Sequence, residues 1–308
     1  MKPAEGILLV DKAPGPTSHD LVARLRKITG LRRVGHAGTL DPFASGLLLT
    51  LLGPATRLSE YFLGMDKEYL AELRLGIETI SHDPDGEVVS ETPGWDRLDP
   101  AGIEAALEGF RGTILQRPPR YSAKKVRGEA AYRRTRRGEA VELKPREVRI
   151  HELELLEVEL PVVKLRVLCS SGTYVRALAR DLGRALELGA HLIALRRTSI
   201  GSFSVESALP LDDQVSPEAV QEKLISPASA LAHLPSMEVD QERARRLRQG
   251  RFLDLAASDL PQDVPVRVLL AGELVAVAAR RGEELRPRKV FGSLADELPG
   301  RQELENGG

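Results

Sequence analysis

The spacing of apolar residues along the first 80 positions alternates between that of strands and that of helices. Residues 6–12 form a short apolar run that ends in charge, which predicts a strand. Thr17 or Ser18 can then cap a helix that ends at Gly30, with an apolar stripe at Leu21, Val22, Leu25 and Ile28. Residues 67–76 alternate strictly, so one face of the predicted strand carries Tyr69, Ala71, Leu73 and Leu75.

The same two spacings recur in the middle of the chain. Asp99 and Pro100 open a helix, and residues 149–169 predict strands. A further helix ends at Gly189, with an apolar stripe formed by Val175, Leu178, Leu182 and Leu186. Arg176 falls one position past the start of this stripe, so the helical period alone predicts that it is a surface residue.

The pattern changes after Leu234. A short helix is expected from Asp240 to Gln249, followed by apolar segments at 264–270 and 274–279 that predict a hairpin. A last strand is expected near 285–291, and such short strands with basic residues indicate a small β-rich domain. We expect the acidic residues 293–308 to form a disordered tail.

Composition bounds the class of protein. A chain of 308 residues has room for about two domains, and 42% hydrophobic with 29% charged residues indicates a globular protein. The lone Cys169 excludes an internal disulfide, and no Cys/His cluster has the spacing of metal ligands. Because the sequence has neither a secretory signal nor an apolar run approaching ~18 residues, we expect a cytoplasmic protein.

The net charge of −1 does not indicate a nucleic-acid partner, but the distribution of charge does. Basic residues far outnumber acidic ones between Arg117 and Arg149, and tyrosines are interleaved with them. Tyrosine rings can stack on bases while lysine and arginine contact phosphates, so this stretch favours RNA contact. An exposed, solvated loop is the alternative interpretation.

The stretch from Val34 to Pro42 is the strongest candidate for chemistry. Two glycines flank His36 and its neighbour, so the backbone there can turn tightly or approach a ligand closely. Asp41 directly precedes a proline, which favours an extended conformation, and the apolar run 43–52 follows. This arrangement can hold one carboxylate rigidly, although a turn or helix-cap aspartate is the alternative.

Residues 35–42 together with 44–48 resemble the catalytic motif of the TruB-type pseudouridine synthases. Further similar blocks, which extend the resemblance over roughly the first two thirds of the chain, lie at 6–20, 67–69, 117–128, 171–183 and 190–198. The resemblance implies an α/β (α+β) protein with the pseudouridine synthase fold. This fold has a large mixed, mostly antiparallel sheet with flanking helices, here followed by a small β-rich PUA-like domain.

The resemblance also implies roles for individual residues. Asp41 is the expected catalytic residue, Arg176 pairs with it and lowers its pKa, and Tyr69 stacks near the target uracil. The residues expected to contact or surround the RNA are His36, Lys12, Asp83, Lys125, Arg136 and Leu195. Within this group, His36 enters the space that the flipped base vacates, and Leu195 forms an apolar wall of the uracil pocket.

The function implied is isomerisation of uridine-55 in the T-loop of tRNA to pseudouridine. The base is flipped, Asp41 assists glycosidic bond cleavage, and the uracil reattaches through C5. We expect no cofactor, no metal, no membrane and no guide RNA, with tRNA as the partner of a monomeric enzyme. The expected domains are a catalytic domain at 1–233, a PUA-like RNA-binding domain at 234–292 and the tail at 293–308.

Two other functions fit parts of the sequence. A non-catalytic RNA-binding or tRNA-folding module would use the same basic stretch, with Asp41 serving only a structural role. A hydrolase with an aspartate nucleophile is the other alternative, but the motif around Asp41 lacks a plausible second carboxylate. Mutation of Asp41 separates the first alternative from the enzyme.

Overall fold

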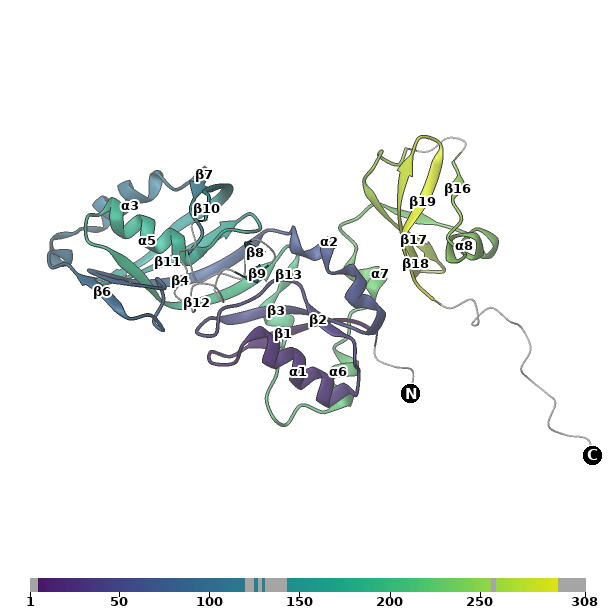
Figure 1. Cartoon of the computed structure of the whole chain (residues 1–308), viewed down its shortest axis with the longest axis horizontal. Coiled ribbons are helices and arrows are strands. Elements are labelled where there is room, and N and C mark those ends of the chain that lie inside the picture. The colour runs from purple at the N-terminus through teal and green to yellow at the C-terminus, as the bar shows by residue number, and fades with distance from the viewer. Residues whose placement is uncertain (1–4, 120–124, 127–128, 131–142, 256–258, 293–308) are drawn as a thin grey trace, which may run out of the picture. The chain divides into compact units, whose positions relative to one another are not determined.

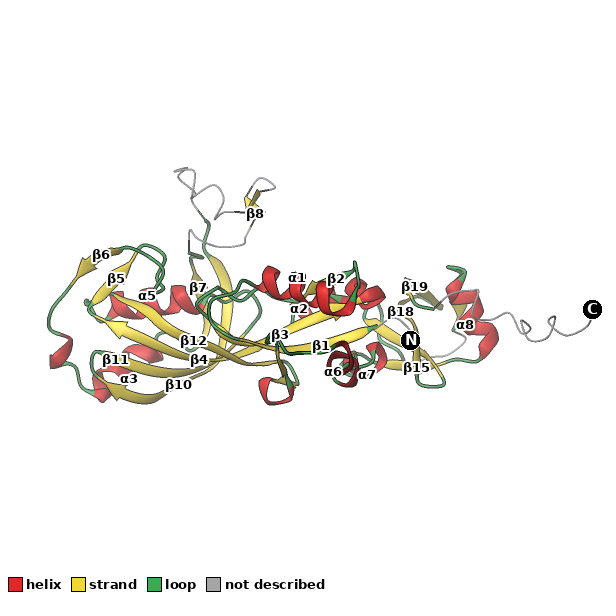
Figure 2. Cartoon of the chain, turned by 90° about the horizontal axis from the view of Figure 1, so that it is seen from below, coloured by secondary structure: helices red, strands yellow, loops and turns green. Residues whose placement is uncertain are grey.

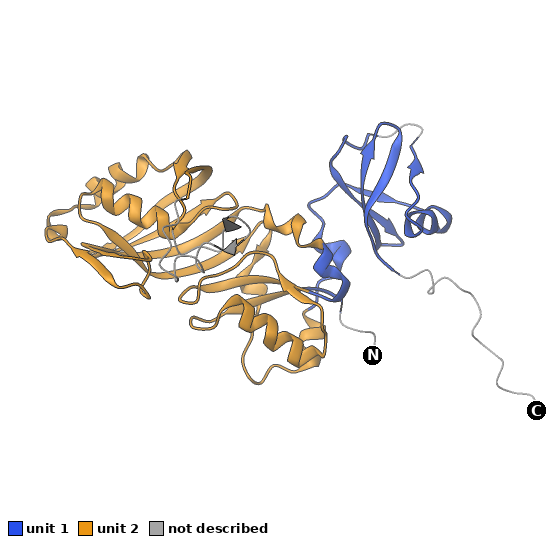
Figure 3. Ribbon diagram, in the orientation of Figure 1, with its two compact units in different colours: residues 1–7, 52–57, 224–308 blue, residues 8–51, 58–223 orange. Residues whose placement is uncertain are grey.

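The computed structural model describes residues 5–119, 125–126, 129–130, 143–255 and 259–292. The chain divides into two compact units, coloured separately in Figure 3. One comprises residues 8–51 and 58–223, and the other comprises 1–7, 52–57 and 224–308. Of the expected RNA contacts, Arg136 and the side chain of Lys125 lie outside the described residues, as does the expected tail.

A large mixed sheet dominates the first unit (Figure 1). In spatial order its strands are β14 (Leu209–Pro210), β1 (Gly6–Lys12), β3 (Ser45–Leu52), β12 (Ala190–Ile200), β4 (Lys67–Leu75), β11 (Val162–Cys169), β10 (Arg146–Glu159) and β7 (Gly112–Gln116). Two short strands pair off this path, β2 (Val34–His36) with β3 and β13 (Phe203–Ser204) with β12. The run from β12 through β4, β11 and β10 to β7 is antiparallel, whereas β3 pairs with β12 in parallel. The predicted mixed and mostly antiparallel sheet is therefore confirmed.

The strict alternation in 67–75 does what the sequence predicts. Every second residue of β4 is buried, beginning at Lys67, and the inward face packs into the main hydrophobic core. β3 is buried along nearly its whole length, as expected for a strand within the sheet that is covered on both faces. The polar exception at its centre is Thr50, whose hydroxyl donates to the carbonyl of Leu8 at 2.8 Å.

Helices cover the large sheet. Figure 2 shows two of them, α1 (Ser18–Thr29) and α5 (Val175–Ala185), on the same side of its strands. Thr17, not Ser18, caps α1, in a capping box with Asp20, and Gly30 ends the helix in the left-handed conformation. The remaining α-helices in the described part of this unit are α2 (Glu60–Leu63), α3 (Pro100–Glu108) and α6 (Pro217–Glu222).

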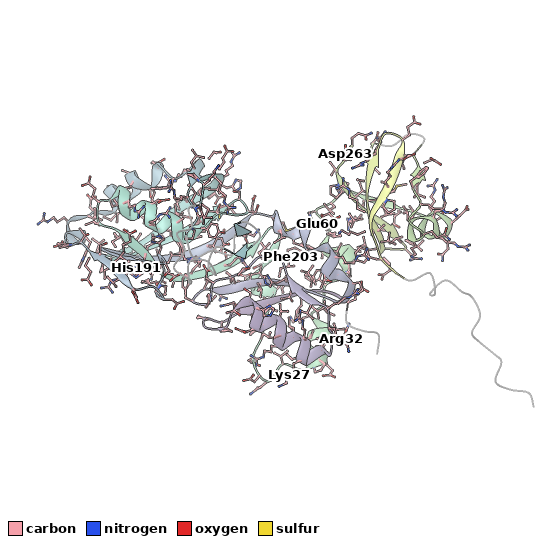
Figure 4. The ribbon with its side chains drawn as sticks, in the orientation of Figure 1. Lys27, Arg32, Glu60, His191, Phe203 and Asp263 are labelled. Atoms are coloured by element: carbon pink, nitrogen blue, oxygen red, sulfur yellow. The ribbon has the colours of Figure 1, made fainter. Side chains whose placement is uncertain are left out.

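Two smaller strand pairs among the described residues are separate from the large sheet. They are β5 (Ile77–Thr79) with β6 (Val88–Glu91), and β8 (Lys125–Val126) with β9 (Glu129–Ala130). His191 of β12, labelled in Figure 4, is buried, and its Nδ1 lies 2.8 Å from the carbonyl oxygen of Ile77. This contact joins β12 to β5 directly before the turn that carries Asp83.

The other unit contains a five-stranded sheet with its own core. Its strand order is β15 (Ser236–Glu238), β17 (Pro265–Leu270), β18 (Glu273–Arg281), β19 (Glu284–Val290) and β16 (Leu253–Asp254). Helices α7 (Pro227–Ala230) and α8 (Gln241–Arg248) accompany it. The predicted hairpin is present, with Ala271 and Gly272 at positive φ between β17 and β18, so the β-rich character of the C-terminal part is confirmed. None of the described helices is long and apolar enough to cross a membrane.

Candidate active site

Residues 37–44 form a loop between β2 and β3, here called the Asp41 loop. Its ends are fixed by backbone bonds, since the Ala37 amide donates to Leu49 at 2.9 Å and the Ala44 amide donates to Asp41 at 3.2 Å. Ser18, the first residue of α1, bonds Leu40 twice, accepting from its amide at 2.9 Å and donating to its carbonyl at 3.1 Å. The backbone on both sides of Asp41 is therefore tightly held.

Lys12 is one of the groups that hold this loop. Its side chain has 0% exposure, and its ammonium donates to the carbonyls of Pro42 at 2.9 Å, Ala44 at 2.6 Å and Ala13 at 3.0 Å. Burial lowers the pKa of Lys12 to about 8. A wholly buried ammonium cannot reach a phosphate, so the expectation of an RNA contact at Lys12 is corrected. Its contacts serve the Asp41 loop.

Arg176 brings two distant aspartates together. Its Nε lies 2.9 Å from Oδ2 of Asp41 and its Nη2 lies 3.2 Å from Oδ1, which gives a bidentate pair. On its other side, Nη1 donates to Asp83 at 3.0 Å and to the carbonyl of Ser81 at 3.1 Å. Asp83, expected among the RNA contacts, is 5% exposed and also accepts from the Ser81 hydroxyl and the Asp85 amide.

The surface position expected for Arg176 from the helical period is wrong, because only 4% of the residue is exposed. Arg176 occupies the first turn of α5, where side chains point back past the N-terminus of the helix. That direction leads to the Asp41 loop and the Asp83 turn. The first six residues of α5 are all buried, so the buried face at this end is far wider than one stripe.

A cavity of about 260 Å³ opens beside the carboxylate of Asp41. Its lining residues are Gly38, Thr39, Leu40, Asp41, Leu63, Lys67, Tyr69, Gly172, Thr173, Tyr174, Val175, Arg176, Leu195 and Arg197. Four of the expected site residues, Asp41, Tyr69, Arg176 and Leu195, are thus brought to one cavity from four separate elements. Asp41 is the only carboxylate among the described lining residues, which disfavours a two-carboxylate hydrolase.

The carboxyl of Asp41 is partly exposed, with 33% of its side chain accessible, yet it lies in a largely dehydrated setting. Burial raises its pKa above the ordinary value; Arg176 opposes this rise, Asp83 adds to it, and Lys12 also opposes it. Arg176 therefore lowers the pKa of Asp41, as expected, but burial outweighs this effect and the net shift is upward. The anion at Asp41 is held in place without being strongly stabilised.

Two further expected residues have distinctive surroundings. Tyr69 is 8% exposed; burial raises the pKa of its hydroxyl, and the neighbouring Arg197 lowers it. His36 is half-buried; burial lowers its pKa, and Arg197 lowers it further. Nδ1 of His36 has no hydrogen-bond partner among the described residues. The imidazole is therefore a neutral ring near the Asp41 loop, and it does not line the cavity.

Sequence reasoning missed two cations of the site, Lys67 and Arg197. Lys67 lines the cavity and donates to the carbonyls of Leu63 and Met65, and burial lowers its pKa to about 8. Alternate residues of a strand lie on the same face, so Arg197 lies on the same face of β12 as Leu195. Because Leu195 was expected at the uracil pocket, this alternation could have identified Arg197 from the sequence. No group of three or more His, Cys, Asp or Glu side chains within the described ranges could hold a metal ion.

A large mixed sheet with a separate β-rich C-terminal sheet is the fold of the pseudouridine synthases. The chain belongs to the TruB family of pseudouridylate synthases. Residues 26–175 match the model of the TruB family pseudouridylate synthase N-terminal domain. Residues 176–231 match that of the tRNA pseudouridylate synthase B C-terminal domain. The predicted family and fold class are confirmed.

Relatives resemble the chain over most of its length. A protein of Thermobifida fusca named tRNA pseudouridine synthase B is 43% identical over 94% of this chain and 99% of its own. Its namesake from Parasynechococcus marenigrum is 44% identical over 93% of this chain and 97% of its own. Among solved structures, an H/ACA RNP bound to a substrate RNA containing 2′-deoxyuridine has a chain with a TM-score of 0.71 and 26% identity. That match covers 94% of this chain and 85% of the other.

Proposed function

We propose that the protein converts uridine-55 in the T-loop of tRNA to pseudouridine. The observation that carries this proposal is the carboxylate of Asp41, held by two bonds from the buried Arg176 at the edge of a cavity of about 260 Å³. The full-length relatives named tRNA pseudouridine synthase B support tRNA as the substrate.

In the proposed reaction the bond between ribose C1′ and uracil N1 breaks, the base turns over, and C1′ bonds to C5. The hydrogen on C5 leaves as a proton, and N1 gains one, so atoms and charge balance without an oxidant or reductant. The ionised Asp41 can attack C1′ or remove a ribose proton, and both routes require the anion. The isomerisation calls for no cofactor.

The cavity can take a nucleobase only after the nucleotide has left its stack. Flipping costs roughly a few kcal/mol, which contacts with the flipped base can offset. Tyr69 would stack on the uracil and Leu195 would form the apolar wall, since both side chains line the cavity. His36, with its free Nδ1 near the Asp41 loop, would fill the space that the base leaves.

RNA recognition is proposed to involve both parts of the chain without a guide RNA. Lys125 and Arg136 belong to the basic stretch and would contact the T stem-loop. The catalytic domain is assigned to 1–233, the PUA-like RNA-binding domain to 234–292 and a tail to 293–308. We propose a monomeric enzyme that acts in the cytoplasm, where tRNA is modified.

The test is tritium release from a tRNA transcript carrying [5-³H]uridine, incubated with purified protein in the presence of a metal chelator. Release should match pseudouridine formation at position 55, and a transcript with cytidine at that position should be inert. A non-catalytic RNA-binding or tRNA-folding module would bind the transcript and release no tritium. Release that depends on an added guide RNA would overturn the guide-independent assignment.

A further inference from the structure

Arg197 is the largest fully buried side chain among the described residues, with 1% exposure, although it lies in a strand next to the cavity. Its guanidinium contacts the backbone at the start of the Asp41 loop and in β3, the strand that follows the loop. Nε donates to the carbonyl of Leu47 at 2.7 Å, and Nη2 donates to that of Gly38 at 3.1 Å. Nη1 lies 3.4 Å from the carbonyl oxygen of Thr39. One cation therefore bridges the start of the loop and the strand that follows it.

Arg197 also contacts the aromatic wall of the cavity. β12 and β4 run antiparallel with Arg197 directly opposite Tyr69, so the two side chains leave the sheet on the same face. Burial raises the pKa of the Tyr69 hydroxyl and the facing guanidinium lowers it, so the two groups interact. The loop that carries Asp41 and the ring that faces the substrate are therefore joined through one side chain.

The backbone of Arg197 is as constrained as its side chain. β3 pairs with β12 in parallel with Gly46 opposite Arg197, and Gly46 has φ +99°. A Cβ at Gly46 would lie 2.2 Å from the carbonyl oxygen of Arg197 and 2.7 Å from its amide nitrogen. These separations are too short for any side chain, so this glycine permits the close approach that seats Arg197 under the loop.

We propose that Arg197 is a positioning residue for the isomerisation: it fixes the separation between the Asp41 carboxylate and the Tyr69 ring. This inference rests on the proposed function. Arg197 does not hydrogen-bond Asp41 in this structure; it acts through the loop carbonyls and the tyrosine hydroxyl. Only a planar guanidinium presents donors in enough directions for these acceptors, whereas a lysine ammonium is a point charge on a different stem.

The neighbouring residue provides a matched control. Arg196 lies on the opposite face of β12, its side chain is 41% exposed, and it pairs with Asp11 at 2.7 Å and 3.1 Å. Arg196→Lys therefore makes the same chemical change, one residue away on the same strand, without touching the Asp41 loop or Tyr69. Because Arg197 is buried and Arg196 is not, thermal unfolding is measured for both variants, and rates are compared at a temperature where each is fully folded.

The experiment compares Arg197→Lys with Arg196→Lys in single-turnover tritium release at saturating tRNA transcript, with filter binding and thermal unfolding alongside. Arg197→Lys should lose roughly 10- to 100-fold in rate, as expected for a misplaced reacting group, while tRNA affinity stays unchanged. Arg196→Lys should retain the wild-type rate. Equal rates for the two variants would overturn the inference.

Coupling to Tyr69 distinguishes positioning from a merely structural role. In the Tyr69→Phe background the hydroxyl is already missing, so Arg197→Lys should cost less than it does in the wild type. Strictly additive losses would contradict a link through that hydroxyl. An inactive wild type would refute the proposed function instead, and the next measurement then still tests the contacts of Arg197.

Amide hydrogen exchange measures the stability of the Asp41 loop directly and does not depend on whether the protein is active. The amides of Ala37, Leu40 and Ala44 are bonded in this structure and should exchange faster in Arg197→Lys than in Arg196→Lys. If Arg197→Lys does not fold, Tyr69→Phe alone tests the same link, because it removes one acceptor of the guanidinium and should loosen these amides. Unchanged exchange in the folded variants would overturn the inference.

Discussion

Arg166 and Arg176 each gather carboxylates, but in opposite surroundings. Arg166 lies on the solvent face of β11 and contacts Glu68 at 2.8 Å, Glu152 at 2.5 Å and Glu154 at 2.8 Å. Arg176 pairs with two carboxylates, those of Asp41 and Asp83, and its side chain is 5% exposed where that of Arg166 is 29% exposed. The region with more ion pairs is not the region with a cavity.

This difference indicates that a functional site is identified by the desolvation cost of its charged groups, and not by the number of ion pairs that they make. At the surface the groups stabilise one another's charged forms: the glutamates raise the pKa of Arg166, and the Thr198 hydroxyl together with Arg166 lowers that of Glu68. At Asp41 burial raises the pKa despite the arginine. The Asp41 carboxylate is therefore anchored but remains more basic than an ordinary aspartate, as a reacting group requires.

The largest effect is expected from Asp41→Asn, which keeps the shape of the side chain and removes the anion. The single-turnover rate should fall by several orders of magnitude, on the order of the cost of removing a nucleophile elsewhere. Binding of the tRNA should survive, because phosphate and stacking contacts lie elsewhere. Near-normal tritium release by a folded Asp41→Asn protein would end the assignment of Asp41.

The next largest effect is expected from Arg176→Ala, compared with Arg166→Ala. Arg176→Ala removes the cation that pairs with the buried Asp83 and the partly exposed Asp41, so we expect a loss of about 3 kcal/mol in the free energy of unfolding. We also expect a rate about 10²- to 10³-fold lower. Arg166→Ala breaks three solvated pairs worth about 1 kcal/mol or less each and should leave the rate unchanged. Denaturant unfolding and single-turnover kinetics check both, and Arg176→Lys should restore activity only in part.

The pH dependence of the rate tests the charge balance at Asp41. Because the ionised form is active, the rate should fall as the pH drops through the pKa of Asp41, at a higher pH than for an ordinary aspartate. Asp83→Asn removes a charge that raises this pKa, so the acid limb should move to lower pH. Glu152→Gln, at the surface arginine, should leave the limb in place. Rates at saturating tRNA across pH check this.

The smallest effect is expected in the salt dependence of tRNA binding. Affinity should fall steeply with salt, as counterions released from the phosphates require. Arg166 is already neutralised by three glutamates, so Arg166→Ala should leave the slope of log Kd against log salt unchanged. A shallower slope in this variant would show that the glutamate cluster faces the RNA.

Much of the fold was predictable because local rules decide it. The period of two fixed the buried face of β4, and Thr17, Gly30 and Asp240 acted as the caps that their types favour. The motif around Asp41 identified the carboxylate at the cavity. In these places short-range geometry and burial agree, so the sequence carries the answer within a few residues.

The remainder depended on contacts between distant segments. Nothing near Lys12 shows that its ammonium serves the carbonyls of Pro42 and Ala44, some thirty positions away. The helical period placed Arg176 at the surface because it ignores what approaches the N-terminal end of α5. The net pKa shift of Asp41 likewise depends on dehydration, which no local pattern reports.

The distance along the chain between Asp41 and Arg176 has a consequence for synthesis. The two residues are 135 positions apart, and ribosomes add about 5–20 residues per second, so Arg176 is made roughly 7 to 27 seconds after Asp41. Throughout that interval the nascent chain contains the Asp41 loop but not Arg176, which pairs with Asp41 in the complete protein. If the proposed pairing is required for activity, we expect the unfinished protein to be inactive on tRNA until α5 has been made and has packed against the Asp41 loop.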